Sequence, residues 1–365
     1  MRNVLKRPVA AFVVAMMMHA AAMAQPAETA ASDARAVMPA SSAAGATPTA
    51  QAEPSYTKGI VYATRTLSKP GAEQRDADAP EQKLDQKLEL KLDLALPARA
   101  EGDTSLRPCV VVIHGGGWAG GRREDVEKFA KFFASREGGG HVAAAVSYRL
   151  APQHAWPAQI VDCADAVRFL RNHASEYGID PSRIGAMGFS AGAHLAMMLA
   201  VGDAGDGLGI ELAADDPVTI AKGPQPSAKV QAAVSVVGPV KLDAADISPE
   251  AKQIVDTFLQ LTPQTPAAER TAKCQQASPL TYVSNGDAPM LLFLGTADPL
   301  IPPTQGPLMA EAMAKHGVPG RVETIVGAGH GWGGVELQRT LAATLEFFGR
   351  AMPPSATPVP TRTKP

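Results

Sequence analysis

Hydrophobic residues in this chain fall into short continuous runs, separated by longer segments in which they recur with helical spacing. The runs cover 109–113, 142–146, 184–187, 230–237, 290–294 and 322–326. Continuous apolar runs of this length are typical of strands that are buried on both faces. The segments at 160–177 and 335–348 repeat apolar residues about every 3.6 positions, which predicts helices. Strands that alternate with helices predict an α/β fold with a mostly parallel sheet covered on both faces.

Two regions depart from this alternation. Strands are predicted at 59–66 and 87–96, and in the second of these every even position from Leu88 to Leu96 is leucine while most odd positions are charged. Strict alternation indicates one face in contact with water, so this strand is placed at an antiparallel N-terminal edge of the sheet. The segment 241–283 contains a predicted helix near 251–261 and several prolines. We interpret it as a small insertion near the functional site.

The N-terminus has the three-part pattern of a secretory signal. Arg2, Lys6 and Arg7 precede an apolar run at 9–18, and an Ala-x-Ala sequence ends at Ala24. This predicts cleavage after Ala24 and a secreted or periplasmic protein. The apolar run is shorter than the roughly 20 residues of a membrane-spanning helix, so no stable membrane insertion is expected after cleavage. An Ala/Ser/Pro-rich linker is predicted at 25–54, one folded domain at 55–352 and a mobile Pro-rich tail at 353–365.

Composition and charge argue against a nucleic-acid partner. The 365 residues are 45% hydrophobic and 19% charged, with a net charge of -2, which argues against a nucleic-acid-binding surface. The three cysteines, Cys109, Cys163 and Cys274, lie far apart in the sequence, so at most one disulfide can form. Which cysteines pair, and the oligomeric state, stay open at this point.

A candidate nucleophile follows the run at 184–187. Gly188-Phe189-Ser190-Ala191-Gly192 has the G-x-S-x-G pattern and leads into a sequence compatible with a helix. A serine in a strained turn between a strand and a helix leaves no room for side chains two residues away on either side, which explains the two glycines. The pattern predicts Ser190 as a nucleophile with an exposed hydroxyl.

A glycine run follows the strand predicted at 109–113. Its sequence at 114–118 is HGGGW. The backbone N–H groups of Gly116 and Gly117, together with that of Ala191, are the predicted oxyanion hole. A phosphate-binding loop would instead require Lys and Ser or Thr directly after the glycines, and residues 118–120 do not supply them.

A general base and an orienting acid are predicted after two other strands. His330 lies in a glycine-rich loop after the run at 322–326, and Asp298 follows the run at 290–294. In a parallel sheet both positions fall at the carboxyl ends of strands, where ligands bind. The rival histidines have structural interpretations: His316 as a helix end, His194 in the helix after Ser190 and His114 as a hydrogen-bonding residue. The order Ser190, Asp298, His330 is the acyl-transfer order of one fold.

These motifs resemble the α/β-hydrolase superfamily, near the hormone-sensitive-lipase-like esterases and the acetyl-xylan and feruloyl esterase-like (BD-FAE-like) proteins. The resemblance covers about 56–352 and rests on 114–118, 147–152 (SYRLAP), Pro157, Ala158, Asp162, the turn at Ser190, 277–280 (ASPL), 298–302 (DPLIP) and 330–331. Ala193 stands where these families usually have glycine, and Phe189 stands where the lipase-like group usually has an acid. Both departures favour the polysaccharide-esterase side.

The resemblance implies a serine esterase that acts through an acyl-enzyme, and the signal sequence predicts that it is exported. The sequence has no dinucleotide-binding fingerprint and no His or Cys pair at metal-ligand spacing, so neither a cofactor nor a metal is expected. We expect short acyl esters as substrates, including those carried by a carbohydrate. Trp118 and Trp332 are predicted to line the substrate pocket. The residues at 25–54 have no amphipathic period that could form a cap, so an open pocket is expected. The alternatives are a lipase-like carboxylesterase of broader acyl range, an exported serine peptidase of the same fold and a non-catalytic binding module.

Overall fold

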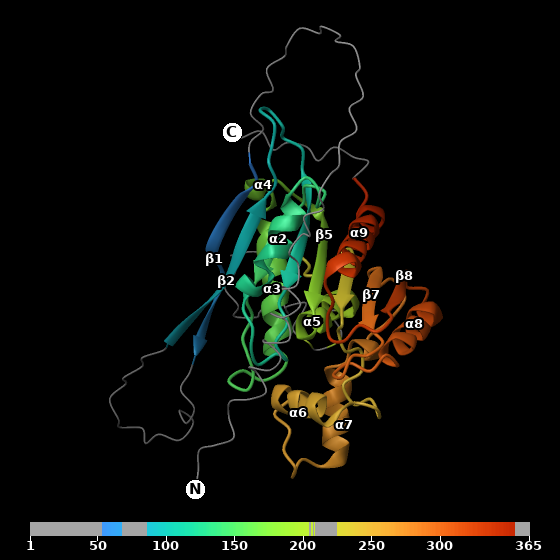
Figure 1. Ribbon diagram of the computed structural model, residues 1–365. Coiled ribbons are helices and arrows are strands. Elements are labelled where there is room, and N and C mark those ends of the chain that lie inside the picture. Colours follow the sequence, from blue (N-terminus) through green and yellow to red (C-terminus); the bar gives the residue numbers. More distant parts are fainter. Residues whose placement is uncertain (1–52, 68–85, 204–205, 207, 209–224, 355–365) are drawn as a thin grey trace, which may run out of the picture.

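The structure is a computed structural model that describes residues 53–67, 86–203, 206, 208 and 225–354 (Figure 1). The predicted signal peptide, residues 25–52 of the predicted linker and residues 355–365 of the predicted tail lie outside the described residues. Within the described ranges, no helix combines the length and apolar character needed to span a bilayer.

Eight strands form one sheet in the order β1-β2-β4-β3-β5-β6-β7-β8. The strands are β1 Ser55–Leu67, β2 Gln86–Leu96, β3 Arg107–Ile113, β4 Val142–Val146, β5 Ile179–Phe189, β6 Ala233–Val236, β7 Met290–Gly295 and β8 Gly320–Ile325. β1 and β2 pair antiparallel with each other, β2 pairs antiparallel with β4, and the ladders from β4 to β8 are parallel. The predicted mostly parallel sheet with an antiparallel N-terminal edge is confirmed.

Helices cover both faces of this sheet (Figure 1). They are η1 Arg123–Val126, α2 Glu127–Ala134, α3 Ala158–Asn172, α4 Ala174–Tyr177, α5 Ala191–Val201, α6 Pro249–Phe258, α7 Ala267–Gln276, η3 Pro279–Thr281, α8 Gln305–His316 and α9 Gly334–Ala351. One buried cluster joins the sheet to α3, α5 and α8, and a second joins it to α2 and α9. The prediction of an α/β fold with helices on both faces is therefore confirmed.

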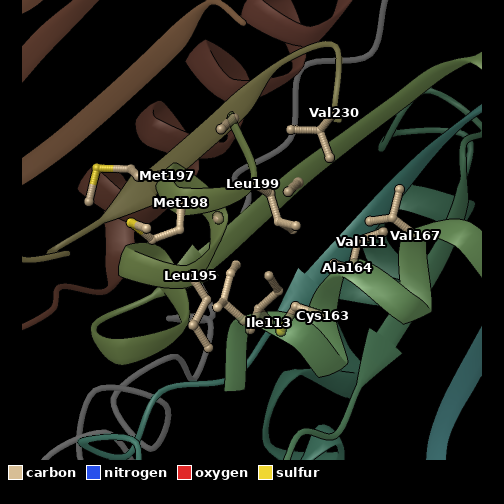
Figure 2. Close-up of a cluster of buried hydrophobic side chains, with 14 of the residues drawn as sticks. Val111, Ile113, Cys163, Ala164, Val167, Leu195, Met197, Met198, Leu199 and Val230 are labelled. Carbon is tan, nitrogen blue, oxygen red and sulfur yellow. The ribbon is translucent and has the colours of Figure 1, made fainter. Parts of the chain in front are cut away.

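Helix α5 lies at the centre of the first cluster. Every one of its residues is buried, so it has no polar face. Figure 2 shows Leu195 and Leu199 of α5 gathered with Val167 of α3 and with Val111 and Ile113 of β3. A helix surrounded by apolar neighbours on all sides is held rigidly, because protein interiors are close-packed. Its first turn therefore provides a fixed support for the residue that precedes it.

Two strand predictions were wrong in detail. β2 does not keep a face in water along its length, because Asp93 is fully buried and its carboxylate accepts hydrogen bonds from Arg123 Nε at 2.7 Å and from the Gly59 N–H at 2.7 Å. A polar residue in an alternating pattern can thus be buried when an ion pair covers it. β8 is not buried on both faces: it is the other edge strand, and Val326 directly after it is 88% exposed.

The segment between β6 and β7 contains α6 and α7, which lie together beyond one end of the sheet (Figure 1). The Ser248 Oγ accepts a hydrogen bond from the Ala251 N–H at 3.2 Å, and Pro249 occupies the first turn, so the start of α6 is well defined. Its buried face carries Ala251, Val255 and Phe258. The predicted insertion therefore contains two helices, and the first of them, α6, is amphipathic with its apolar side buried against the rest of the domain.

The cysteines do not form a disulfide. Cys109, Cys163 and Cys274 are all free and buried. Burial disfavours the charged thiolate and raises the pKa of Cys109 to about 12 and that of Cys274 to about 11. These thiols therefore behave as small apolar side chains.

Candidate active site

Ser190 lies in a sharp turn between β5 and α5. Its φ of 53° and ψ of -118° are a strained conformation for a residue other than glycine. A Cβ at Gly188 would lie 2.1 Å from the Gly192 O, and a Cβ at Gly192 would lie 2.3 Å from the Ile113 O. The two glycines are therefore required by the close approach of neighbouring backbone, as the G-x-S-x-G pattern predicts. The turn places Ser190 at the carboxyl end of β5.

The structure brings Ser190, His330 and Asp298 into one hydrogen-bonded chain. His330 Nε2 is 2.8 Å from Ser190 Oγ, and His330 Nδ1 is 2.8 Å from Asp298 Oδ2. All three residues are buried, with 7%, 7% and 8% of their surfaces exposed for Ser190, His330 and Asp298. Exclusion of water strengthens each of these polar contacts.

Asp298 and His330 lie in adjacent loops that follow the paired strands β7 and β8. The two loops are in close contact: a Cβ at Gly295 would lie 2.3 Å from the Gly329 O, and the Ala297 N–H donates to the Ala328 O at 2.9 Å. Gly295 is therefore the position at which the absence of a side chain lets the loops meet. This contact sets the distance between the carboxylate and the imidazole.

The orientation of Asp298 is fixed by backbone donors. Its Oδ1 accepts hydrogen bonds from the Leu300 N–H at 2.8 Å and from the Ile301 N–H at 3.0 Å, which leaves Oδ2 to face His330. An ionised carboxylate only accepts hydrogen bonds, so His330 carries its proton on Nδ1. The free Nε2 lone pair then points at the Ser190 hydroxyl, which is the tautomer needed to remove its proton.

The predicted oxyanion loop follows β3. Gly116, Gly117 and Trp118 have φ values of 115°, 58° and 57°, so the backbone is left-handed or strained at three consecutive residues. Gly117 and Ala191 line the cavity at Ser190, whereas Gly116 does not. Within the described ranges, the N–H groups of Gly116 and Gly117 have no protein acceptor. Ala191 begins α5, where helix N–H groups lack an intrahelical acceptor.

The cavity at Ser190 has an empty volume of about 500 Å³, including the part that is open to solvent. Besides Ser190, His330, Gly117 and Ala191 its lining is Trp118, Pro239, Lys241, Leu242, Ile247, Ala251, Ile254, Val255, Leu300, Ile301, Pro302 and Gln305. Most of these side chains are apolar, and those of 247–255 come from α6 and the loop before it. The segment 241–283 therefore supplies an apolar wall that the sequence did not predict, and the cavity is still partly open to solvent.

The two tryptophans predicted to line the pocket have different positions. Trp118 lines the cavity and stacks on Phe258 of α6, with ring centroids 4.1 Å apart and planes at 11°. Trp332 does not line it: its ring contacts Phe293 in the second buried cluster, and its indole N–H donates to Thr340 Oγ1 at 3.0 Å. The prediction that Trp332 lines the pocket was therefore wrong, because its ring packs in the second buried cluster, on the other side of the sheet from α5.

The other histidines near the site have structural partners. His114 Nδ1 is 2.8 Å from the Gly115 O, and its ring stacks on Tyr148 with centroids 4.3 Å apart. Burial disfavours the imidazolium and lowers the pKa of His114 to about 4. His316 is the last residue of α8, as predicted. Among the described residues, no cluster of three or more His, Cys, Asp or Glu side chains could hold a metal ion.

Three groups at the site were not predicted from the sequence. They are the Leu300 and Ile301 N–H groups that hold Asp298, the apolar side chains of α6, and the hydrogen bonds of His194. The first had a usable signal, because Asp before Pro commonly starts a turn in which the carboxylate accepts backbone N–H groups. The second had a partial signal in the amphipathic pattern at 249–258, which predicts a buried face but not what the face covers.

The sheet order, the strained serine turn after β5 and the two loops after β7 and β8 define the α/β-hydrolase class. The chain belongs to the BD-FAE family, whose family model matches residues 92–313. That range contains β3 to β7, Ser190 and Asp298, and it ends before His330.

Individual relatives agree with this family. The chain is 30% identical to Esterase LipC of Mycobacterium tuberculosis over 247 residues, which are 66% of this chain and 57% of LipC. It is 27% identical to Esterase LipQ of the same organism over 212 residues, which are 58% of this chain and 46% of LipQ. The chain therefore spans about half the length of these curated relatives.

Among solved structures, a thermophilic esterase of Thermogutta terrifontis, Est2, matches with a TM-score of 0.59 and 25% identity, covering 82% of this chain and 95% of Est2. Est2 has also been solved with butyrate bound; that structure has a TM-score of 0.57 and 29% identity, and covers 74% of this chain and 92% of Est2. The same esterase has been solved after phosphonylation by sarin.

Proposed function

We propose that the protein is a serine carboxylesterase that hydrolyses esters through an acyl-enzyme on Ser190. The observation that carries the proposal is the continuous hydrogen-bonded chain from Ser190 Oγ through His330 to Asp298. Membership of the BD-FAE family and similarity to LipC and Est2 support the same activity. The phosphonylation of Est2 by sarin fits an activated nucleophile in that protein and supports one here.

In this mechanism His330 Nε2 takes the proton of the Ser190 hydroxyl as Oγ attacks the ester carbonyl carbon. The carbonyl oxygen takes the electron pair of the C–O double bond and becomes an oxyanion. This oxyanion accepts hydrogen bonds from the N–H groups of Gly117 and Ala191, with Gly116 as a further predicted donor. The tetrahedral intermediate collapses, His330 returns its proton to the leaving alcohol, and the acyl group stays on Ser190. Water, deprotonated by His330, then attacks the acyl carbon. The second tetrahedral intermediate collapses, Ser190 Oγ leaves and takes the proton back from His330, and the acid is released.

The cavity supports a preference for short acyl groups. Ile247, Ile254 and Val255 limit the space on one side of the cavity at Ser190 with apolar side chains, which suits a small alkyl group better than a long one. The butyrate found in Est2, which has a similar fold, is an acid of this size. We therefore propose acetyl to butyryl esters as the preferred substrates.

The natural alcohol and the location are further parts of the proposal. The signal-like sequence that ends at Ala24 supports export to the periplasm or the medium, where polysaccharide esters are encountered. Carbohydrate-linked acetyl or feruloyl esters are therefore the proposed biological substrates. A lipase-like carboxylesterase with a broader acyl range is the alternative, because a longer acyl chain would gain about 0.8 kcal/mol for each methylene that it buries against the apolar lining.

A chain-length series tests the substrate proposal. Aryl acetate, propionate, butyrate, hexanoate and octanoate are compared by kcat/KM, beside acetylated xylan and a feruloyl ester, with Ser190→Ala as the blank. The proposal predicts a maximum at acetate to butyrate and no hydrolysis by the Ser190→Ala protein. A kcat/KM that rises steadily through octanoate favours the lipase-like alternative and contradicts the short-acyl proposal.

A further inference from the structure

His194 lies one turn after Ser190 on α5 and takes no part in the chain from Ser190 to Asp298. The His194 side chain is fully buried, and the backbone N–H of His194 donates to the backbone O of Ser190 at 3.0 Å. Both ring nitrogens have protein partners. Nδ1 is 3.2 Å from Trp118 Nε1, and Nε2 is 2.6 Å from the Ala277 O.

The two partners of His194 require the same tautomer. The indole N–H of Trp118 can only donate, so His194 Nδ1 must be the acceptor. The carbonyl of Ala277 can only accept, so His194 Nε2 must carry the proton. One neutral imidazole therefore joins three elements: the loop after β3, helix α5, and the segment after α7.

The loop held by this bond is the one that carries the predicted oxyanion donors. Trp118 directly follows Gly117, and its φ of 57° is unfavourable for a side chain of this size. A strained conformation persists only when surrounding contacts hold it. The contacts of the buried Trp118 side chain include the hydrogen bond to His194 and the stack on Phe258, and the Trp118 O accepts from the Ala151 N–H at 2.9 Å.

We propose that His194 is a positioning residue that, through Trp118, holds the Gly117 N–H in the direction of the oxyanion. The proposal rests on the proposed esterase function. Loss of the bond from Trp118 to His194 lets the strained loop relax, which weakens hydrogen bonding to the charge that develops on the carbonyl oxygen. Binding of the uncharged ester changes little, because the α6 wall and Ser190 stay in place.

Two substitutions at His194 separate its two hydrogen bonds. In His194→Asn the amide Oδ1 takes the place of Nδ1 and still accepts from Trp118. In His194→Gln the amide Nε2 takes the place of the ring Nε2 and still donates to Ala277, but the acceptor for Trp118 is lost. Trp118→Phe removes the same hydrogen bond from the other side and keeps a ring to stack on Phe258.

The test compares kcat and KM for an aryl acetate with the inhibition constant of a trifluoromethyl ketone, which forms a tetrahedral oxyanion on the serine. The expected result is a kcat at least about tenfold lower for His194→Gln and for Trp118→Phe, with KM within about threefold. The inhibition constant rises by a similar factor. His194→Asn keeps kcat within about threefold, and the double variant His194→Gln, Trp118→Phe is no slower than the slower single variant.

A folded His194→Gln protein with unchanged kcat, or equal losses for His194→Gln and His194→Asn, would overturn the positioning role. If His194→Gln does not fold, Trp118→Phe decides alone: an unchanged kcat overturns the role and a lowered kcat with an unchanged KM supports it. These results require a wild-type protein that hydrolyses the ester. Wild-type protein without hydrolysis refutes the proposed function and this inference with it.

Discussion

His330 Nε2 lies 2.8 Å from Ser190 Oγ although 140 positions separate the two residues in the chain. The parallel sheet produces this contact, since β5 and β8 both end at the edge where Ser190 and His330 follow them. Asp298 follows β7, the strand that pairs with β8. The chemistry of the site therefore depends on the register of strands whose side chains take no part in it.

The contact from Ser190 to His330 predicts a large difference between two histidine substitutions. His330→Ala removes the group that accepts the serine proton, so kcat/KM for an aryl acetate should fall by about three orders of magnitude or more. His316→Ala, at the end of α8, should leave kcat/KM within about threefold. Steady-state kinetics of both proteins check this, and a reversed order of the losses would show that another loop supplies the base.

Two glycine substitutions, one in the serine turn and one in α9, are predicted to have opposite effects on stability. A Cβ at Gly192 would lie 2.3 Å from the Ile113 O, so Gly192→Ala should lower the free energy of unfolding by about 2–4 kcal/mol. A Cβ at Gly349 in α9 would meet no neighbouring atom within 4 Å, so Gly349→Ala should raise it by about 0.5–1 kcal/mol. Urea denaturation measures both. Equal effects would contradict the tight turn.

The wall formed by α6 predicts that acyl-chain preference can be changed there. Ile254 lines the cavity next to Gly117, so Ile254→Ala should make room for about two more methylenes. The ratio of kcat/KM for hexanoate to that for acetate should then rise about tenfold. Lys252→Ala, at an exposed position of the same helix, is the matched control and should leave the ratio unchanged. A ratio that is the same in both variants would place the acyl group elsewhere.

Burial of His194 predicts a loss of stability in acid. Burial disfavours the charged ring and lowers the pKa of His194 from 6.5 to about 4. Between these two values the unfolded chain binds the proton and the folded protein does not, so stability decreases as the pH falls through 6.5 toward 4. From pH 7.5 to 5.0 this residue should lower the free energy of unfolding by about 2 kcal/mol.

The matched control for this effect is His194→Asn, which keeps the hydrogen bond from Trp118 but does not titrate. Its free energy of unfolding should decrease less between pH 7.5 and 5.0 than that of the wild type, by about 2 kcal/mol. Urea denaturation at the two pH values measures the difference. Identical decreases in the two proteins would show that His194 does not stay neutral in the folded state.

The strands of the core and the positions of Ser190, Asp298 and His330 could be predicted from the sequence because they depend on local patterns. Continuous apolar runs mark buried strands, and polar residues directly after such runs fall at one edge of a parallel sheet. The structure places these three residues together as predicted. Gly188 and Gly192 were also predictable, because a strained turn restricts residue type within a few positions.

The rest of the site depends on contacts between distant segments. The pattern of α6 indicates a buried face, but only the tertiary structure shows that Ile254 faces Gly117. The alternation in β2 predicted a wet face, whereas Arg123 folds over Asp93 and buries it. Trp332 was predicted to line the pocket, but its ring contacts Phe293 instead. Local periodicity carries no information about such pairings.

The most direct measurement is covalent labelling of the wild-type protein with a fluorophosphonate, followed by mass spectrometry of the intact protein and its peptides. The proposed mechanism predicts one adduct per chain, located on Ser190, with loss of esterase activity in proportion to labelling. Ser190→Ala should stay folded, take up no label and hydrolyse no ester. Labelling at another residue with loss of activity, or a folded Ser190→Ala protein with near wild-type turnover, would contradict Ser190 as the nucleophile.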